Sequence, residues 1–288
     1  MQFRFLFRLW WISFFLLGAC VEKVDHIHLN EDAGVPILFS VLRNNESIRV
    51  FTGYTAGIFD YSPEEHVERN AQVVLFRNGT PIDTATPGQD NYSYFHTFPQ
   101  AGTTYRLEAR FPGGKLLSGT TTFPASLPIQ LTGSEVLQRN NQKTFHLRLH
   151  IDDPAGTNYY LFVVRPNMDY WNDNLTESSD FPAPPGTQII DPNGWGHTIL
   201  ALSDQGFDGQ EMDVNLYFDA TNIDDTNGFV FYQAICDEAY YEYLKYLSTG
   251  HYYSGDPFGT METENPHGNV EGGYGFVGSV LQRTDTIR

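Results

Sequence analysis

The sequence is poor in cysteine, in cations and in long apolar segments. Its 288 residues include two cysteines, and 17 lysines and arginines against 35 acidic residues, for a net charge of −18. A surface of this charge repels phosphate backbones, so nucleic acid is not an expected partner. The apolar run at residues 9–19 has 11 residues, whereas a membrane-spanning helix needs roughly 20. This run is too short to cross a bilayer.

The N-terminal apolar run ends in a motif typical of lipid-anchored proteins. Two arginines precede the run, as in secretory signals. Its end, "LGAC" at residues 17–20, resembles the bacterial lipobox, in which the cysteine is acylated, for example with palmitate, and becomes the first residue. We predict a signal at residues 1–19, a lipidated Cys20 and a polar tether at residues 20–33. The alternative is an ordinary cleaved signal in which this cysteine is incidental.

Acylation of Cys20 would leave Cys236 without a partner in the chain, so an internal disulfide is not expected. Stability must then come from a buried core. Aromatic residues make up 15% of the chain, and 26 glycines and 16 prolines stand against only 4 methionines. This composition favours many short strands joined by turns. We therefore expect an all-β protein.

Residues 34–124 are predicted to form a first β-sandwich of the immunoglobulin-like or prealbumin-like kind. Runs rich in β-branched and aromatic residues recur along this region. In "TYRLEARF" (residues 104–111), apolar and charged residues alternate, which is typical of a strand with one wet face. Asn78-Gly79 predicts a tight hairpin.

Residues 125–288 are predicted to form a second β-sandwich. In "TFHLRLHI" (residues 144–151), alternation places four apolar side chains inward. One amphipathic helix is expected at residues 237–248, where Asp237 can serve as the N-cap. Its apolar stripe should pack on the second sandwich and consists of Tyr240, Tyr243, Leu244 and Leu247.

Residues 165–196 show no clear periodicity but contain several aromatic residues. Loops of this length are usually functional or mobile. One hypothesis is a segment that faces a ligand or partner through Tyr170, Trp171 and Trp195. The other is a plain surface insertion.

The histidines do not predict a metal site. His26 and His28 would lie about 7 Å apart on an extended segment, but no third ligand accompanies them. His146 and His150 share a strand face about 13 Å apart, which is too far for one ion. We expect no metal and no cofactor.

No residue pattern predicts catalysis. The acid pairs at residues 152–153 and 224–225 are interpreted as turn residues. Cys236 precedes the predicted helix, where the dipole could lower its pKa, but no histidine neighbours it, and a buried free cysteine is favoured. Neither a nucleophile elbow nor a phosphate loop is present. The protein is not expected to be an enzyme.

Two short motifs resemble the Asp-Thr-apolar sites of O-glycosylation in Bacteroidota. They are residues 83–85 and 285–287, so Thr84 and Thr286 are candidate acceptors.

The C-terminal region resembles a Bacteroidota lipoprotein family catalogued as domain of unknown function 4249. The stretch at residues 256–279 matches the family's order of Pro-Phe, Asn and a Gly-Gly-x-Gly-Phe motif, here Pro257, Phe258, Asn269, Gly272, Gly273, Gly275 and Phe276. Four stretches upstream of this region fall in the same order as the family's strands: "NAQVVLF", "GTTYRLEARFPGG", "HIDDPAGTNYYLFVV" and "FDG". The glycines are interpreted as shaping a bend before the last strand, or as an interface for a partner.

The resemblance implies an outer-membrane lipoprotein on the cell surface, encoded beside a SusC- or FecA-like TonB-dependent receptor. It implies no catalytic residues. The leading hypothesis is a non-enzymatic accessory that captures substrate for the receptor, or caps or braces its barrel. A stand-alone glycan- or peptide-binding lipoprotein and a lipid-anchored hydrolase are the second and third hypotheses.

Overall fold

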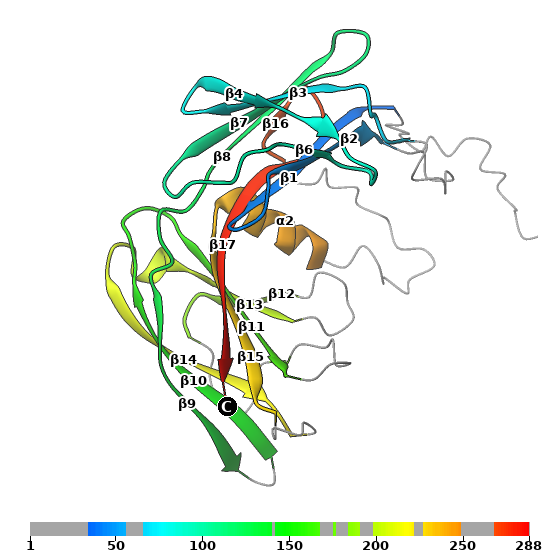
Figure 1. Cartoon of the computed structure of the whole chain (residues 1–288). Coiled ribbons are helices and arrows are strands. Elements are labelled where there is room, and N and C mark those ends of the chain that lie inside the picture. Colours follow the sequence, from blue (N-terminus) through cyan, green and yellow to red (C-terminus); the bar gives the residue numbers. More distant parts are fainter. Residues whose placement is uncertain are drawn as a thin grey trace, which may run out of the picture. The chain divides into compact units, whose positions relative to one another are not determined.

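The computed structural model describes residues 34–55, 66–139, 142–167, 175–176, 184–190, 198–221, 227–248 and 268–287. Cys20, its tether, the histidines 26 and 28 and the three aromatic residues of the predicted partner loop lie outside these residues. The described part forms three β-sheets and one α-helix (Figure 1). None of its helices is long and apolar enough to cross a membrane. The expectation of an all-β, sandwich-like fold is confirmed.

The largest sheet has nine strands, in the order β12-β13-β11-β15-β17-β1-β2-β6-β5. Its strands are β1 (Pro36–Arg43), β2 (Arg49–Tyr54), β5 (Thr86–Pro87), β6 (Ser93–Tyr94), β11 (Tyr159–Pro166), β12 (Thr187–Ile190), β13 (Ile199–Ser203), β15 (Phe229–Cys236) and β17 (Val277–Ile287). The last strand of the chain lies near the middle of this sheet. It pairs in parallel with β1 and antiparallel with β15.

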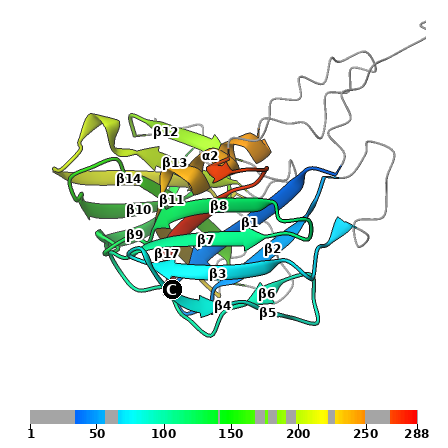
Figure 2. The same ribbon diagram turned by 90° about the horizontal axis from the view of Figure 1, so that it is seen from above.

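A five-stranded sheet covers one half of the large sheet, as Figure 2 shows from above. It has the order β16-β8-β7-β3-β4 and consists of β3 (Gln72–Arg77), β4 (Thr80–Thr84), β7 (Thr104–Arg110), β8 (Leu116–Thr122) and β16 (Val270–Glu271). The first hydrophobic core lies between these layers and contains Leu38, Val50, Leu75, Leu107 and Val277 among others.

A three-stranded sheet, in the order β14-β10-β9, covers the other half. It is built from β9 (Ile129–Arg139), β10 (Gln142–Asp152) and β14 (Glu211–Asp219). The second core fills the space between the layers, with Leu147, Phe162, Leu216, Phe231 and Ile287 among its residues. On the opposite face of the large sheet, helix α2 (Glu238–Ser248) completes a third, smaller cluster.

Along the chain, the first core gives way to the second between Phe123 and Leu127. Phe123 is the last residue before β9 in the first core, and Leu127 packs against the second. This division falls beside the boundary predicted at residue 124. The C-terminal region is the exception, because Val270 of β16 packs against the first core and β17 contributes Val277 to the first core and Ile287 to the second. The separation into two independent domains stays a prediction.

Residue alternation explains the strands. The four apolar residues predicted to face inward along β10 are Phe145, Leu147, Leu149 and Ile151, and each is at most 2% exposed. The hairpin prediction at Asn78-Gly79 is confirmed: both residues have positive φ, 50° and 83°, and join β3 to β4. This left-handed geometry matches the twist of a two-residue hairpin turn.

Helix α2 starts at its predicted cap, because the Asp237 carboxylate accepts a hydrogen bond from the Tyr240 N–H at 3.0 Å. The predicted stripe is wrong in one respect. Tyr241, which it omitted, is 4% exposed and stacks on Tyr159 with ring centroids 4.1 Å apart. The helix therefore packs with a face turned further toward β11 and β12 than the spacing of apolar residues indicated.

Candidate functional site

Two glycines of the motif before β17 lie against the backbone of β1. A Cβ atom at Gly275 would overlap the carbonyl oxygen of Leu38, and one at Gly273 would overlap that of Pro36. Gly275 also has a φ of 116°, which side chains rarely adopt. Between them, the Tyr274 N–H donates to Pro36 O at 3.0 Å. The close neighbour of these glycines is thus β1 of the same chain.

Asn269, at the start of the motif, ties three chain segments together. Its amide nitrogen donates to the carbonyls of Thr120 and Val277, both at 2.8 Å, and its amide oxygen accepts from the Val277 N–H at 2.8 Å. The amide therefore replaces a neighbouring strand at the beginning of β17 and caps the open edge of β8.

Phe276 anchors helix α2 to the sheet. It is 2% exposed, and its ring lies 4.5 Å from that of Phe39, edge to face, and 4.1 Å from that of Tyr243. Two residues later, Gly278 lets the helix approach, because a Cβ there would come to 3.0 Å from the Cβ of Tyr240. The motif therefore positions the helix as well as the strand.

A buried polar network completes this junction. The Asp237 carboxylate accepts hydrogen bonds from the Thr121 hydroxyl and from the Ser279 N–H. The Thr121 and Ser279 hydroxyls are 2.8 Å apart, and the latter donates to the Thr122 carbonyl. Burial raises the pKa of Asp237 above its ordinary value, although its three hydrogen-bond donors oppose the shift.

A cleft of about 510 Å³ opens beside this network, between the edge of β8 and the first turn of α2. Its walls carry Thr120, Thr121, Thr122, Asp237, Glu238, Glu242 and Asn269. The carbonyls of Thr120 and Thr122 are already hydrogen-bonded to Asn269 and Ser279. The strand side of the cleft therefore has no free carbonyl at these positions with which to pair an added strand.

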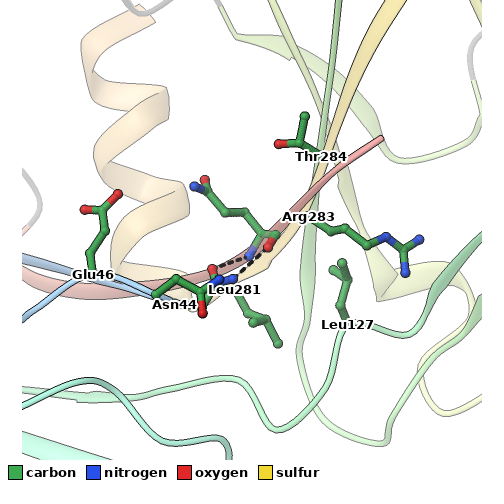
Figure 3. Close-up of a pocket in the computed structure, with 8 residues that line it drawn as sticks. Asn44, Glu46, Leu127, Leu281, Arg283 and Thr284 are labelled. Atoms are coloured by element: carbon green, nitrogen blue, oxygen red, sulfur yellow. Dashed lines mark hydrogen bonds between the residues drawn. The ribbon is translucent and has the colours of Figure 1, made fainter. Parts of the chain in front are cut away.

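A second cleft, of about 680 Å³, lies where the two cores meet (Figure 3). Asn44 holds β17 there: its amide nitrogen donates to the Gln282 carbonyl and its oxygen accepts from the Gln282 N–H, both at 2.9 Å. Arg283 donates to the Ile129 carbonyl at 3.0 Å and contacts Asp285. Leu127 forms an apolar wall. The polar groups at this cleft mainly secure the C-terminal strand.

A group of three aspartates was not predicted. Oxygens of Asp153, Asp204 and Asp208 lie within 4.8 Å of one another, the one such group with metal-binding potential among the described residues. Asp153 had been interpreted as a turn residue, but it is 4% exposed and accepts hydrogen bonds from the Tyr160 hydroxyl and the Gly209 N–H. Burial, together with this carboxylate, raises the pKa of Tyr160.

Backbone donors occupy the other two aspartates of this group. The Asn158 N–H donates to Asp204 at 2.6 Å and the Gly156 N–H to Asp208 at 2.8 Å. The group thus ties the turn after β10 to the turn before β14. Sequence reasoning missed the group because about fifty residues separate Asp153 from Asp204 and Asp208. The one signal for it in the sequence was the "FDG" motif around Asp208.

The remaining candidates do not converge. His146 is buried between Glu135 and Asn215, and His150, further along the same face of β10, contacts Asp213 at 2.8 Å. The Asp213 carboxylate raises the pKa of His150.

Cys236 is a buried free thiol, and burial raises its pKa well above the ordinary value, so the thiolate is disfavoured. Thr84 and Thr286 are exposed, each on a strand, and nothing in the structure tests their modification.

Comparison with known proteins places the chain in one family. The model of the family described as "Domain of unknown function (DUF4249)" matches residues 28–286. The protein belongs to this family. None of the curated proteins matches the chain.

Solved structures give only distant similarities. A DUF4785 family protein from Legionella pneumophila is 11% identical, with 68% of this chain and 49% of that chain covered and a TM-score of 0.26. The major pilin SpaD from Corynebacterium diphtheriae is 8% identical, with 70% and 62% covered and a TM-score of 0.22. The chain thus spans about half of the first protein and under two thirds of the second.

Gly275→Ala should lower the free energy of unfolding by more than about 3 kcal/mol, because it combines a backbone clash with an unfavourable φ. Urea unfolding followed by circular dichroism measures the change. The matched control is Gly113→Ala, which also has a positive φ, 89°, but no atom within 4 Å of the added Cβ. The control should cost about 1 kcal/mol. Equal costs would mean that the close approach to Leu38 is not required.

Asp237→Asn should gain stability relative to the wild type as the pH rises. A carboxyl whose folded pKa is raised stabilises the protein fully below its ordinary value of 3.8, and this contribution is lost as the pH rises through the folded pKa. The asparagine amide can donate to Thr121 and accept from the two N–H groups at every pH. Asp237→Ala, which removes the helix cap, should lose about 1–2 kcal/mol throughout.

Unfolding curves of the three proteins between pH 4 and pH 8 test this prediction. A wild type that instead gains on Asp237→Asn with rising pH would show that the carboxylate is favoured in the folded state.

Proposed function

We propose that the protein is a lipid-anchored outer-membrane protein of the bacterial surface that acts, without catalysis, as an accessory to a TonB-dependent receptor. In this role it would capture substrate for the receptor, or cap or brace its barrel. The observation that carries the proposal is the lipobox-like "LGAC" at residues 17–20, directly ahead of a region of the DUF4249 family that begins at residue 28.

The position of the cysteine supports an anchored, folded domain. Only 14 residues, 20–33, separate the start of the mature chain from the first described residue. Fully extended, they would span at most about 50 Å. The folded region would therefore stay close to the membrane, where an integral receptor also resides.

The described side chains support an accessory rather than an enzyme. The thiol of Cys236 is buried and protonated, so it is a poor nucleophile. The two histidines of β10 contact carboxylates, His146 that of Glu135 and His150 that of Asp213. Asn269 at one cleft and Asn44 at the other hold the chain's own backbone.

Replacing Cys20 by serine should abolish acylation and release the protein from the membrane fraction, because a thioether-linked lipid requires the cysteine sulfur. Stable anchoring needs more than one acyl chain. Mass spectrometry of the wild type should find an acylated N-terminus at residue 20. A mature protein that begins at another residue would contradict the anchor.

The partner is tested by purification of the acylated protein in mild detergent. A co-purifying β-barrel receptor is expected, and it should be recovered equally with Cys236→Ala, which changes only a buried thiol. Recovery of the lipoprotein alone, under conditions that keep other receptor complexes intact, would favour a stand-alone binding protein.

A further inference from the structure

Two neighbouring cations at one end of the five-stranded sheet have no side-chain partner within the described part of the chain. Arg110 ends β7, Lys115 lies in the turn that follows, and Arg110 is opposite Leu116 in the strand register. Both cations are exposed. Several other cations contact acids, amides or aromatic rings: examples are Arg106 with Glu108, Arg148 with Glu135, Arg77 with Gln100 and Arg165 with Tyr232.

Free cations are unexpected in a chain with twice as many acids as bases. Neither side chain contacts a carboxylate within the described residues. The adjacent Leu116 adds a large apolar side chain that is 44% exposed. The tip thus combines two positive charges with apolar surface, a pairing typical of segments that touch a lipid interface.

This turn lies at the end of the fold where the chain enters from its tether. A Cβ at Gly273 would touch both the Pro36 carbonyl and, at 2.7 Å, the side chain of Leu117, so the starts of β1 and β8 are separated by one glycine. Figures 1 and 2 both place the β7–β8 turn and the start of β1 at the same end. Gly34 is fixed there through its N–H, which donates to the Thr55 carbonyl at 2.9 Å.

We propose that the β7–β8 turn is the surface that the anchored protein rests on the membrane, with Arg110 and Lys115 contacting lipid phosphate groups and Leu116 entering the headgroup layer. The inference rests on the proposed lipid anchor. The tether of about 50 Å at most keeps the turn at high effective concentration near the bilayer, so weak contacts suffice.

The charges set the expected size of the effect. Each cation near an anionic surface favours contact about fivefold, and reversal of its charge should cost more than that. The contact should weaken with salt, because exposed charges are screened beyond about 10 Å at 0.1 M ionic strength.

The test places a fluorophore at Pro112→Cys in the acylated protein, anchored in phosphatidylcholine vesicles that contain phosphatidylglycerol and a headgroup quencher. Cys236 is buried and Cys20 acylated, so labelling is selective. The reference probe is Thr80→Cys, in the hairpin at the opposite end of the same sheet. Quenching at residue 112 should exceed quenching at residue 80 several-fold, and high salt should reduce the difference.

Lys115→Glu and Arg110→Glu should each reduce quenching at residue 112 at least fivefold. The matched control is Arg77→Glu, a charge reversal at the far end of β3, which should leave it unchanged. Three results would overturn the proposal. They are equal quenching of the two probes, equal quenching at residue 112 on pure phosphatidylcholine, and a change in quenching at residue 112 that occurs only when a barrel co-purifies. A wild type that does not remain with the vesicles would instead refute the lipid anchor itself.

Discussion

The structure depends on the insertion of the last strand into the middle of the largest sheet. β17 pairs with β1 from the beginning of the fold and with β15 from its end. Without it, the nine-stranded sheet would separate into two halves, each with exposed backbone donors and acceptors along a central edge. Such edges are costly to leave unpaired and invite pairing with other chains.

Two asparagine side chains hydrogen-bond backbone groups of β17 at positions where a neighbouring strand does not. Asn269 pairs with the backbone of Val277 at the start of β17, and Asn44 pairs with Gln282 just beyond its contact with β1. Each amide offers a donor and an acceptor in the geometry of a neighbouring strand. The glycines between Gly272 and Gly278 then allow β1, β8 and α2 to approach. The glycine motif is accordingly explained by closure of the fold.

Closure of the fold by β17 determines which polar groups are hydrogen-bonded within the chain and which face solvent. At the two clefts, Asn269 and Asn44 bind backbone groups of the same chain, and Asp237, Thr121 and Ser279 bind one another. Polar groups that are used in this way contribute specificity of structure. Arg110 and Lys115, at the β7–β8 turn, face solvent.

Local patterns were enough to predict the strands, the hairpin at Asn78-Gly79 and the helix cap at Asp237. These features depend on alternation, on left-handed backbone geometry and on a short-range hydrogen bond, all of which operate within a few residues. The parallel pairing of β1 with β17 could not be predicted, because it joins Ser40 to Val277. Neither could the aspartate group around Asp153, whose members meet only after the second sandwich has formed.

The central claim is that β17 couples the two cores. Native-state hydrogen exchange of the amides of Leu107, in the first core, and Leu147, in the second, tests it in the wild type and in Gly275→Ala. If the strand unites the cores, the substitution should lower the opening free energy of both amides by the same amount, although it lies at the edge of the first core alone. A loss confined to Leu107, with Leu147 unchanged, would show that the two halves are independently stable domains.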